Sequence, residues 1–176
     1  TETMIREVFQ HTKGIQLPDP FPRYSYDEVM NRYGTDKPDT RFDMKLMDVS
    51  AYFTETTFGV FQRVLADQGM IMGINAEKMG HSSRKQIEAW SDVVREKGAK
   101  GVIPLKIMED STIKSTITKF MSDGEQKAII EHFKATQGDL ILLVADTFFI
   151  ATESLGHLRL AIAHSQDLIP ENEFQF

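Results

Sequence analysis

The residues of this sequence that could do chemistry are its histidines, carboxylates and basic side chains, because the 176-residue chain has no cysteine. Thiolate nucleophiles, thiolate metal sites and disulfides are therefore excluded. The histidines are His11, His81, His132, His157 and His164. A zinc or iron site needs several ligands at close spacing, with a carboxylate nearby. Only the last two histidines share a predicted helix face, so the pattern favours solvated or partly buried histidines and predicts no metal ligand.

Motifs that mark catalytic or nucleotide sites do not occur in the sequence. No Gly-x-Gly-x-x-Gly or Gly-x-x-x-x-Gly-Lys spacing is present to hold a phosphate, and no Gly-x-Ser-x-Gly turn presents a nucleophile. The neighbouring acids Glu109 and Asp110 lie in a predicted turn, whereas catalytic carboxylates need apolar surroundings. The residues therefore predict no catalytic, cofactor-binding or metal site within this chain.

A local excess of basic residues stands out in a chain whose formal net charge is −6. The negative total excludes a protein that binds nucleic acid through an overall basic field. Between positions 84 and 119, however, eight basic residues face five acidic ones. If this region contacts a phosphate backbone, the residues expected to face RNA are Arg84, Lys85, Lys100 and Lys119. The alternative is a solvated surface of helices and strands, and the mixed charges favour it.

The most unusual local composition lies at residues 34–41, Gly-Thr-Asp-Lys-Pro-Asp-Thr-Arg. Four of these eight residues are charged, and a proline lies among them. Such a composition is typical of a turn, and exposed loops often carry function. Composition alone predicts a turn after a helix and makes its charged residues functional candidates.

Helices must position these candidates, and three capping boxes predict where helices begin. Each box places a serine three residues before a Glu or Gln, so that the two side chains satisfy backbone N–H groups at the helix start. The boxes are Ser25–Glu28, Ser83–Gln86 and Ser122–Glu125. A glycine follows each of these helices where it can end. With two further periodic segments, the predicted helices cover residues 2–13, 26–33, 84–97, 123–136 and about 147–164.

Four strand-like segments lie between the helices, at residues 58–65, 70–76, 102–108 and 139–145. The first two are separated by a connection of hairpin length that contains Gly69. Mixed hairpin and helical connections predict an α+β fold. It is a two-layer sandwich in which helices cover one face of a mainly antiparallel four-stranded sheet.

Residues 14–47 differ from the rest, because they hold four of the six prolines and no extended core pattern. This change in composition places a boundary near Leu46. The longest apolar run, Leu140 to Ala151, is short and interrupted by Asp146, so no membrane span is expected. No signal peptide is recognisable, and a cytoplasmic location is expected. The chain opens on a helical pattern and stops within an alternating stretch, which predicts a piece cut from a longer protein.

Two ordered sets of motifs resemble one enzyme family. The runs LPDPFPRYSYDEVM at 17–30 and RYGTDKPDTRF at 32–42 are similar to bacterial-type aspartyl-tRNA synthetase. Later motifs resemble the GAD domain that is inserted in that family's catalytic domain, namely SRKQI at 83–87, GAKG at 98–101, TKF at 118–120, GD at 138–139, AD at 145–146 and LGHLR at 155–159. The resemblance covers nearly the whole chain, and its 20–42 stretch is the most specific part.

The resemblance implies a division of the chain and an activity for its parent. Residues 1–46 would be a flanking catalytic-domain segment, 47–168 the GAD insertion domain, and 169–176 a return strand toward the catalytic domain. The parent would activate aspartate with Mg-ATP and transfer it to tRNA, as a cytoplasmic homodimer that does not bind membranes. The family's catalytic motifs fall outside this chain, so the fragment is expected to be inactive and without cofactor. Lys37, Asp39 and Arg41 would lie at the rim of the parent's active site.

Other classes of function remain open from the residues alone. A stand-alone RNA- or protein-interaction module would use the basic region between Arg84 and Lys119 as its contact surface. A small-molecule sensor built on the sheet has no supporting feature beyond the fold. The sequence also leaves open whether the insertion contacts tRNA and whether the parent charges tRNA(Asn) as well as tRNA(Asp).

Overall fold

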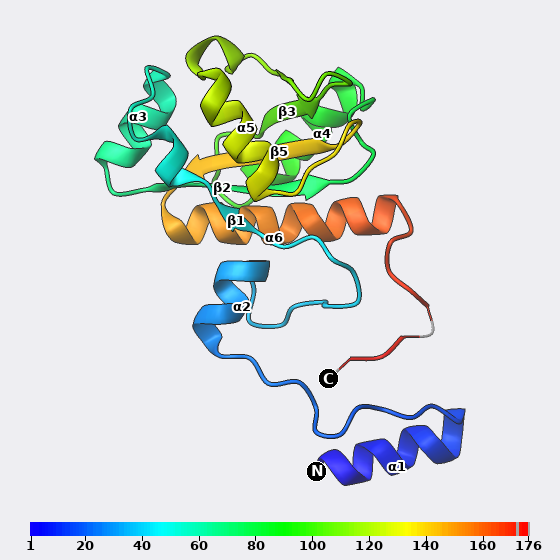
Figure 1. The fold of residues 1–176 in the computed structure, drawn as a ribbon. Helices are drawn as coiled ribbons and strands as arrows, with labels where there is room; N and C mark the ends of the chain where they lie inside the picture. The colour runs from blue at the N-terminus through cyan, green and yellow to red at the C-terminus, as the bar shows by residue number, and fades with distance from the viewer. Residues whose placement is uncertain (172, 176) are drawn as a thin grey trace.

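Two long antiparallel strands form the centre of the fold. In this computed structural model, which describes residues 1–171 and 173–175, β2 (Met70–Ala76) pairs with β5 (Leu140–Asp146) along its whole length. Shorter strands extend the sheet on both sides, in the order β1-β2-β5-β3-β4, and every pair is antiparallel (Figure 1). These shorter strands are β1 (Met47–Asp48), β3 (Ile103–Ile107) and β4 (Ile113–Lys114).

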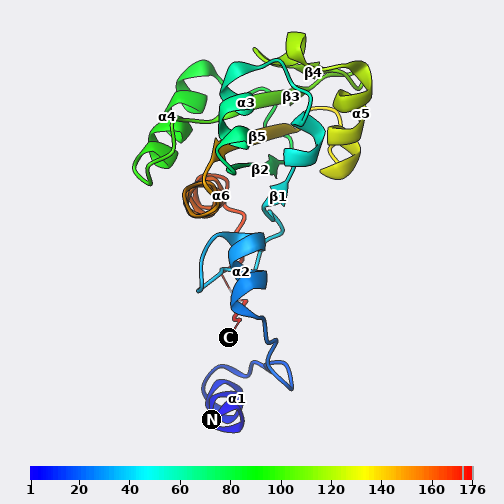
Figure 2. The same cartoon turned by 90° about the vertical axis from the view of Figure 1, so that its left-hand side faces the viewer.

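The central strands read as nearly continuous apolar runs because helices cover both faces of the sheet. On one face, α4 (Arg84–Arg95) and α6 (Phe148–Ser165) pack against Met72, Ile74 and Leu142. On the other face lie η1 (Ser50–Phe53), α3 (Gly59–Ala66) and α5 (Asp123–His132), with the short η2 (Thr118–Phe120) beside them. Figure 2 shows the sheet between these two groups of helices. We call β1 to α6, residues 47–165, the body.

The α+β class and the mainly antiparallel sheet predicted from the sequence are confirmed, but two details of that prediction differ. The described sheet has five strands rather than four, since β1 and β4 are two-residue edge strands too short to leave a sequence pattern. Helices also cover two faces rather than one. Alternate residues of β5 enter separate apolar clusters, with Leu142 and Val144 on one side and Ile141 and Leu143 on the other.

The segment at 58–65 was predicted as a strand, and this prediction is wrong, because the segment forms α3. Phe61 and Val64 are buried and three residues apart, a spacing that puts both on one face of a helix but on opposite faces of a strand. The expected hairpin turn at 66–69 is the end of this helix, where the Gly69 N–H donates to the Val64 carbonyl at 2.8 Å. The strand prediction failed because a short apolar run does not by itself distinguish the helical period of about 3.6 residues from the strand period of 2.

The five predicted helices are confirmed, with ends that differ by a few residues. α1 spans Glu2–Lys13 and α2 spans Tyr26–Tyr33, and both end in a left-handed glycine. In the Ser122 box both capping hydrogen bonds form, while Ser25 and Ser83 each accept a backbone N–H three residues on. Among the described residues, none of the helices is both long and apolar enough to cross a membrane.

The N-terminal segment lies on the side of α6 that faces away from the sheet. Figures 1 and 2 place α2 beneath α6 and α1 at the far end of the molecule, so α6 is enclosed between the sheet and this segment. Phe42, Met44 and Leu46 join the apolar cluster around α6, whereas no residue of α1 is buried. Residues 173–175 form no strand here, and Phe176 lies outside the described residues. The return strand expected at 169–176 therefore stays a prediction about the parent, as do the domain boundaries.

Candidate functional site

A buried arginine on α6 lies at the junction between the body and the N-terminal segment. The side chain of Arg159 is fully buried, and all of the hydrogen bonds described for its guanidinium go to backbone carbonyls. Its Nε donates to the Met44 carbonyl at 2.8 Å, and both Nη atoms donate to the Asp39 carbonyl at 3.0 Å. Its Cζ also lies 4.0 Å from the centre of the Phe42 ring. The guanidinium is therefore held by main-chain dipoles and an aromatic face.

Burial of this group has an electrostatic cost that the carbonyls reduce. Desolvation lowers the pKa of Arg159 to about 10, while Tyr33, Asp39 and Asp43 act in the opposite direction. Since this pKa lies well above 7, the guanidinium remains a cation at neutral pH. A buried cation is tolerated only where hydrogen bonds replace its water shell.

The loop predicted at 34–41 is the segment that Arg159 contacts. Arg41 donates to the Asp39 carboxylate through Nε at 3.0 Å and through Nη2 at 2.7 Å, a two-point pair between an arginine and a carboxylate. The Arg41 guanidinium holds the pKa of Asp39 below its ordinary value. Asp39 thus uses its carbonyl for one arginine and its carboxylate for the other.

Arg41 also reaches the segment that follows α6. Its Nη1 lies within hydrogen-bond distance, 3.4 Å, of both the Pro170 and the Glu173 carbonyls. The residues that lead into the body and those that leave it are therefore joined through one side chain. We call Asp39, Arg41 and Arg159 the Arg159 cluster.

Of the three residues predicted at an active-site rim, the structure brings two together. Asp39 and Arg41 form the ion pair described above. Lys37 is exposed and lines an open hollow of about 520 Å³ together with Tyr24, Tyr26 and Pro38. Their role at a rim stays a prediction.

The four residues predicted to face RNA are exposed, but they do not form one patch. Arg84 and Lys85 begin α4, and Lys100 lies beyond its other end. A helix of this length spans about 18 Å. Lys119 lies on η2, whose neighbour Phe120 packs with the helices on the opposite face of the sheet. Its ammonium lies 4.9 Å from the centre of the Phe120 ring.

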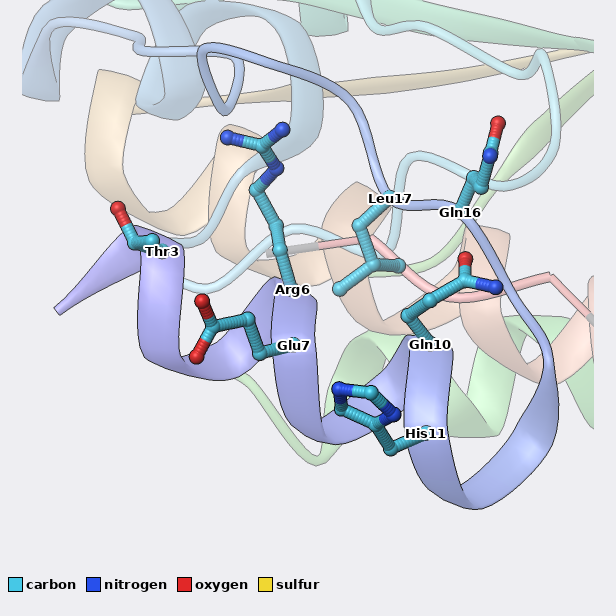
Figure 3. Close-up of a pocket in the computed structure, with 7 residues that line it drawn as sticks. All are labelled: Thr3, Arg6, Glu7, Gln10, His11, Gln16 and Leu17. Carbon is cyan, nitrogen blue, oxygen red and sulfur yellow. The ribbon is translucent and has the colours of Figure 1, made fainter.

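Other polar features offer weaker candidates. Figure 3 shows a hollow of about 440 Å³ lined by α1 and by residues 16–17, with Arg6, Gln10 and His11 among its side chains. Arg6 is already paired with Asp19 at 2.6 Å. In the part of the chain that the structure describes, no group of three or more His, Asp or Glu side chains could hold a metal ion. The Arg159 cluster joins a fully buried cation to the segments before and after the body, and we take it as the candidate site.

Sequence reasoning missed Arg159 as a site residue, although it noted the LGHLR motif. Its partners lie 115 to 120 residues away along the chain, so no local pattern could indicate them. Gly156, three residues earlier, was an indication. Glycine lowers helix stability, so a glycine within a helix suggests that another part of the backbone lies very close to it. Here a Cβ at Gly156 would lie 2.6 Å from the Tyr33 carbonyl.

Most of the body matches a known domain class. The family model described as the GAD domain matches residues 61–155, more than half of the chain, and the chain belongs to the GAD domain family. The match runs from α3 into α6, so it covers most of the body and ends four residues before Arg159.

Curated relatives extend the similarity to nearly the whole chain. The aspartate–tRNA(Asp/Asn) ligase of Thermoanaerobacter sp. (strain X514) is 42% identical over 175 residues, which cover 99% of this chain and 29% of that ligase. The ligases of the same name from Natranaerobius thermophilus and Bacillus subtilis (strain 168) are 42% and 43% identical, each over 99% of this chain and 30% of their own length. The predicted resemblance to bacterial-type aspartyl-tRNA synthetase is confirmed, and the chain spans about 30% of the length of these relatives.

Proposed function

We propose that this chain is the GAD-bearing segment of an aspartate–tRNA ligase and is not catalytic by itself. The observation that carries the proposal is similarity to such ligases over 99% of the chain, including the residues before 61 that the GAD match does not cover. In an interaction module that shared only a GAD domain with these ligases, we would not expect the N-terminal segment to resemble theirs as well.

The proposed ligase joins aspartate to tRNA at the expense of Mg-ATP, in the cytoplasm and as a homodimer. Its acceptors would be tRNA(Asp) and tRNA(Asn), because the relatives' names give both. In this proposal the body and the N-terminal segment pack against the remainder of the catalytic domain, and residues outside this chain bind aspartate and Mg-ATP. The exposed apolar side chains of α1, Met4 and Val8, are consistent with such packing.

Aspartate-dependent pyrophosphate exchange tests both parts of the proposal. The 176-residue chain is expected to show no exchange above background, whereas a ligase that contains this chain should exchange and should charge tRNA(Asp). Exchange by the isolated chain would contradict the proposed division of labour. A containing protein that neither exchanges nor charges tRNA would contradict the proposed function itself.

The stand-alone RNA-binding alternative makes a different prediction about salt. Because Arg84, Lys85, Lys100 and Lys119 are spread over opposite faces, few of them can contact one phosphate backbone together. We therefore expect weak tRNA binding by the isolated chain, with a slope of log K against log salt no steeper than about −2. A slope of about −5 or steeper would favour the RNA-binding module.

A further inference from the structure

We propose that Arg159 is a positioning residue, which fixes the orientation of the body relative to the two segments that connect it to the rest of a ligase. These connecting segments are residues 34–46, which lead into the body, and the described residues after 165, which leave it. The inference deepens the proposed function and rests on it for its catalytic consequence.

Arg159 donates its described hydrogen bonds to main chain rather than to side chains. Its three nitrogens donate to the carbonyls of Asp39, Phe42 and Met44, at 2.8 to 3.3 Å. Side-chain partners can follow a moving arginine by changing rotamer, but carbonyls move only with the backbone. The planar guanidinium therefore sets the course of residues 39–44 along α6.

Asp39 connects the hydrogen bonds of Arg159 to the other connecting segment. Its carbonyl accepts from Arg159, while its carboxylate accepts from Arg41. Arg41 in turn donates to the Pro170 and Glu173 carbonyls. Movement of either connecting segment relative to α6 would break at least one of these charge-assisted hydrogen bonds.

A close backbone contact with α2 lies about one turn earlier on α6. A Cβ at Gly156 would lie 2.6 Å from the Tyr33 carbonyl, and a Cβ at Gly34 would collide with the Thr152 carbonyl. The end of α2 is thus seated directly on α6, next to the Arg159 cluster. The N-terminal segment therefore contacts α6 on two successive turns, at Gly156 and at Arg159. Two such contacts resist rotation of this segment about α6, whereas a single contact would not.

Distance measurements on the 176-residue chain test the positioning role directly. The chain has no cysteine, so Asp27→Cys on α2 and Glu131→Cys on α5, both exposed positions, give one specific pair of spin labels. The unchanged chain should give one narrow distance distribution. Arg159→Lys keeps the charge but cannot form the planar fork, so the distribution should widen by about twofold or more.

Two further variants keep this test decisive. Arg41→Gln, at a partly exposed side chain, removes the ion pair that holds Asp39 beside Arg159, together with the link to the exit segment, and should also widen the distribution. Arg95→Gln is the matched control, since the partners of Arg95 in the described structure are Glu88, Asp92 and the Lys100 carbonyl, all within the body. An unchanged width in folded Arg159→Lys would overturn the proposal. If Arg159→Lys does not fold, Arg41→Gln decides by the same criterion.

The consequence for catalysis is measured in a ligase that contains this chain. tRNA is the substrate large enough to extend from the catalytic centre to the body. Arg159→Lys should therefore raise KM for tRNA by roughly 2- to 30-fold, the range seen for residues along a coupling network, with little change in pyrophosphate exchange. A parallel loss of both activities, together with a lower Tm, would reduce Arg159 to a stabilising role. If the unchanged ligase shows no exchange, the proposed function fails, while the distance measurements still decide the role of Arg159.

Discussion

Two charged side chains are buried in the described structure, and the backbone satisfies both. Arg159 donates to carbonyls, and Asp139 accepts from backbone N–H groups. The Asp139 carboxylate lies 2.8 Å from the N–H groups of both Lys78 and Thr136, and it also accepts from the Asn75 amide. Burial by itself would raise the pKa of Asp139, but these hydrogen bonds outweigh it, and the pKa lies below its ordinary value. Both buried charges therefore fix the conformation of the loops whose backbone they bind.

Asp139→Asn should lower stability in a pH-dependent way. The amide would turn a donor toward another donor, at a cost of about 1–3 kcal/mol at pH 7. Because the folded pKa of Asp139 is depressed, its contribution is present above the unfolded value of about 3.9 and disappears as the pH falls through the folded value. In urea unfolding between pH 7 and pH 3, the difference in stability between the two proteins should therefore narrow toward the acid end. The exposed Asp67→Asn serves as control, and a gap that stayed constant with pH would contradict this account.

At the residue scale, the sequence predicted local helix caps and selected candidate residues by type, but it could not predict which residues far apart in the chain are in contact. Ser122 and Glu125 could be paired from their spacing, and the structure forms both hydrogen bonds. Asp39 and Arg41 could be selected from an unusual loop composition, yet their bonds to Pro170 and Arg159 span more than 110 residues. Long-range contacts of this kind depend on how helices pack, which no short motif records.

Among the elements, α6 has the most demanding environment. It packs on the sheet through Ala151 and Leu155, and on the N-terminal segment through Gly156 and Arg159. The face that carries Gly156 and Arg159 is therefore buried as well. The segment that covers this face comes from before residue 47, where the composition predicted a separate unit.

Gly156→Ala should destabilise the chain even though alanine favours helices. Alanine gains about 1 kcal/mol in helix propensity over glycine. At this site, however, its Cβ would meet the Tyr33 carbonyl at 2.6 Å, and the seating of α2 on α6 must shift. We expect a net loss of about 1–3 kcal/mol, as for other overpacked sites, measured by urea unfolding.

Gly124→Ala is the matched control for this prediction. Gly124 lies in the first turn of α5, and the nearest atom to an added Cβ would be the Ser122 Oγ at 3.9 Å. The change should be neutral or stabilising by up to about 1 kcal/mol. Equal effects of the two substitutions would show that helix propensity, not the close approach, governs Gly156.

The element prediction that failed shows a limit of periodicity. Phe58, Phe61 and Val64 fit the spacing of a helix face, and alternate apolar residues of the same run fit a strand. The structure resolves this through aromatic packing, since the Phe61 ring lies 4.7 Å from that of Phe53 and 5.0 Å from that of Phe58. The contact with Phe53 comes from a preceding 3-10 turn that the sequence did not predict.

On the scale of the whole molecule, the N-terminal segment is two parts with different roles. Residues 33–46 supply Tyr33, Phe42, Met44 and Leu46, all buried, and complete the cover of α6. α1 buries none of its residues and lies at the far end of the molecule (Figure 1). The boundary near Leu46 predicted from composition therefore cuts through an apolar cluster in the structure.

Two shortened chains should separate these parts. A chain of residues 24–176 keeps the Ser25 cap and α2. It loses the buried Leu17 and Phe21, but these belong to neither apolar cluster of the body, so its Tm should fall by no more than about 4 °C. A chain of residues 47–176 loses the seven buried apolar side chains that precede Met47 and uncovers Arg159, so its Tm should fall by at least about 10 °C. Thermal melts followed by circular dichroism measure both. Equal melting of the two shortened chains would mean that residues 47–176 are an independent folding unit after all.

The contacts of Arg41 with the Pro170 and Glu173 carbonyls bear on how a ligase containing this chain could gain or lose the body during evolution. These contacts join positions 129 and 132 residues apart in the sequence, so the body begins and ends at almost the same place. The entropy of closing a loop grows only with the logarithm of its length, and a ten-residue bridge across this gap would differ from the present connection by about 2 kcal/mol. A host enzyme could therefore exchange the whole body for a short surface loop during evolution without reshaping the rest of its chain.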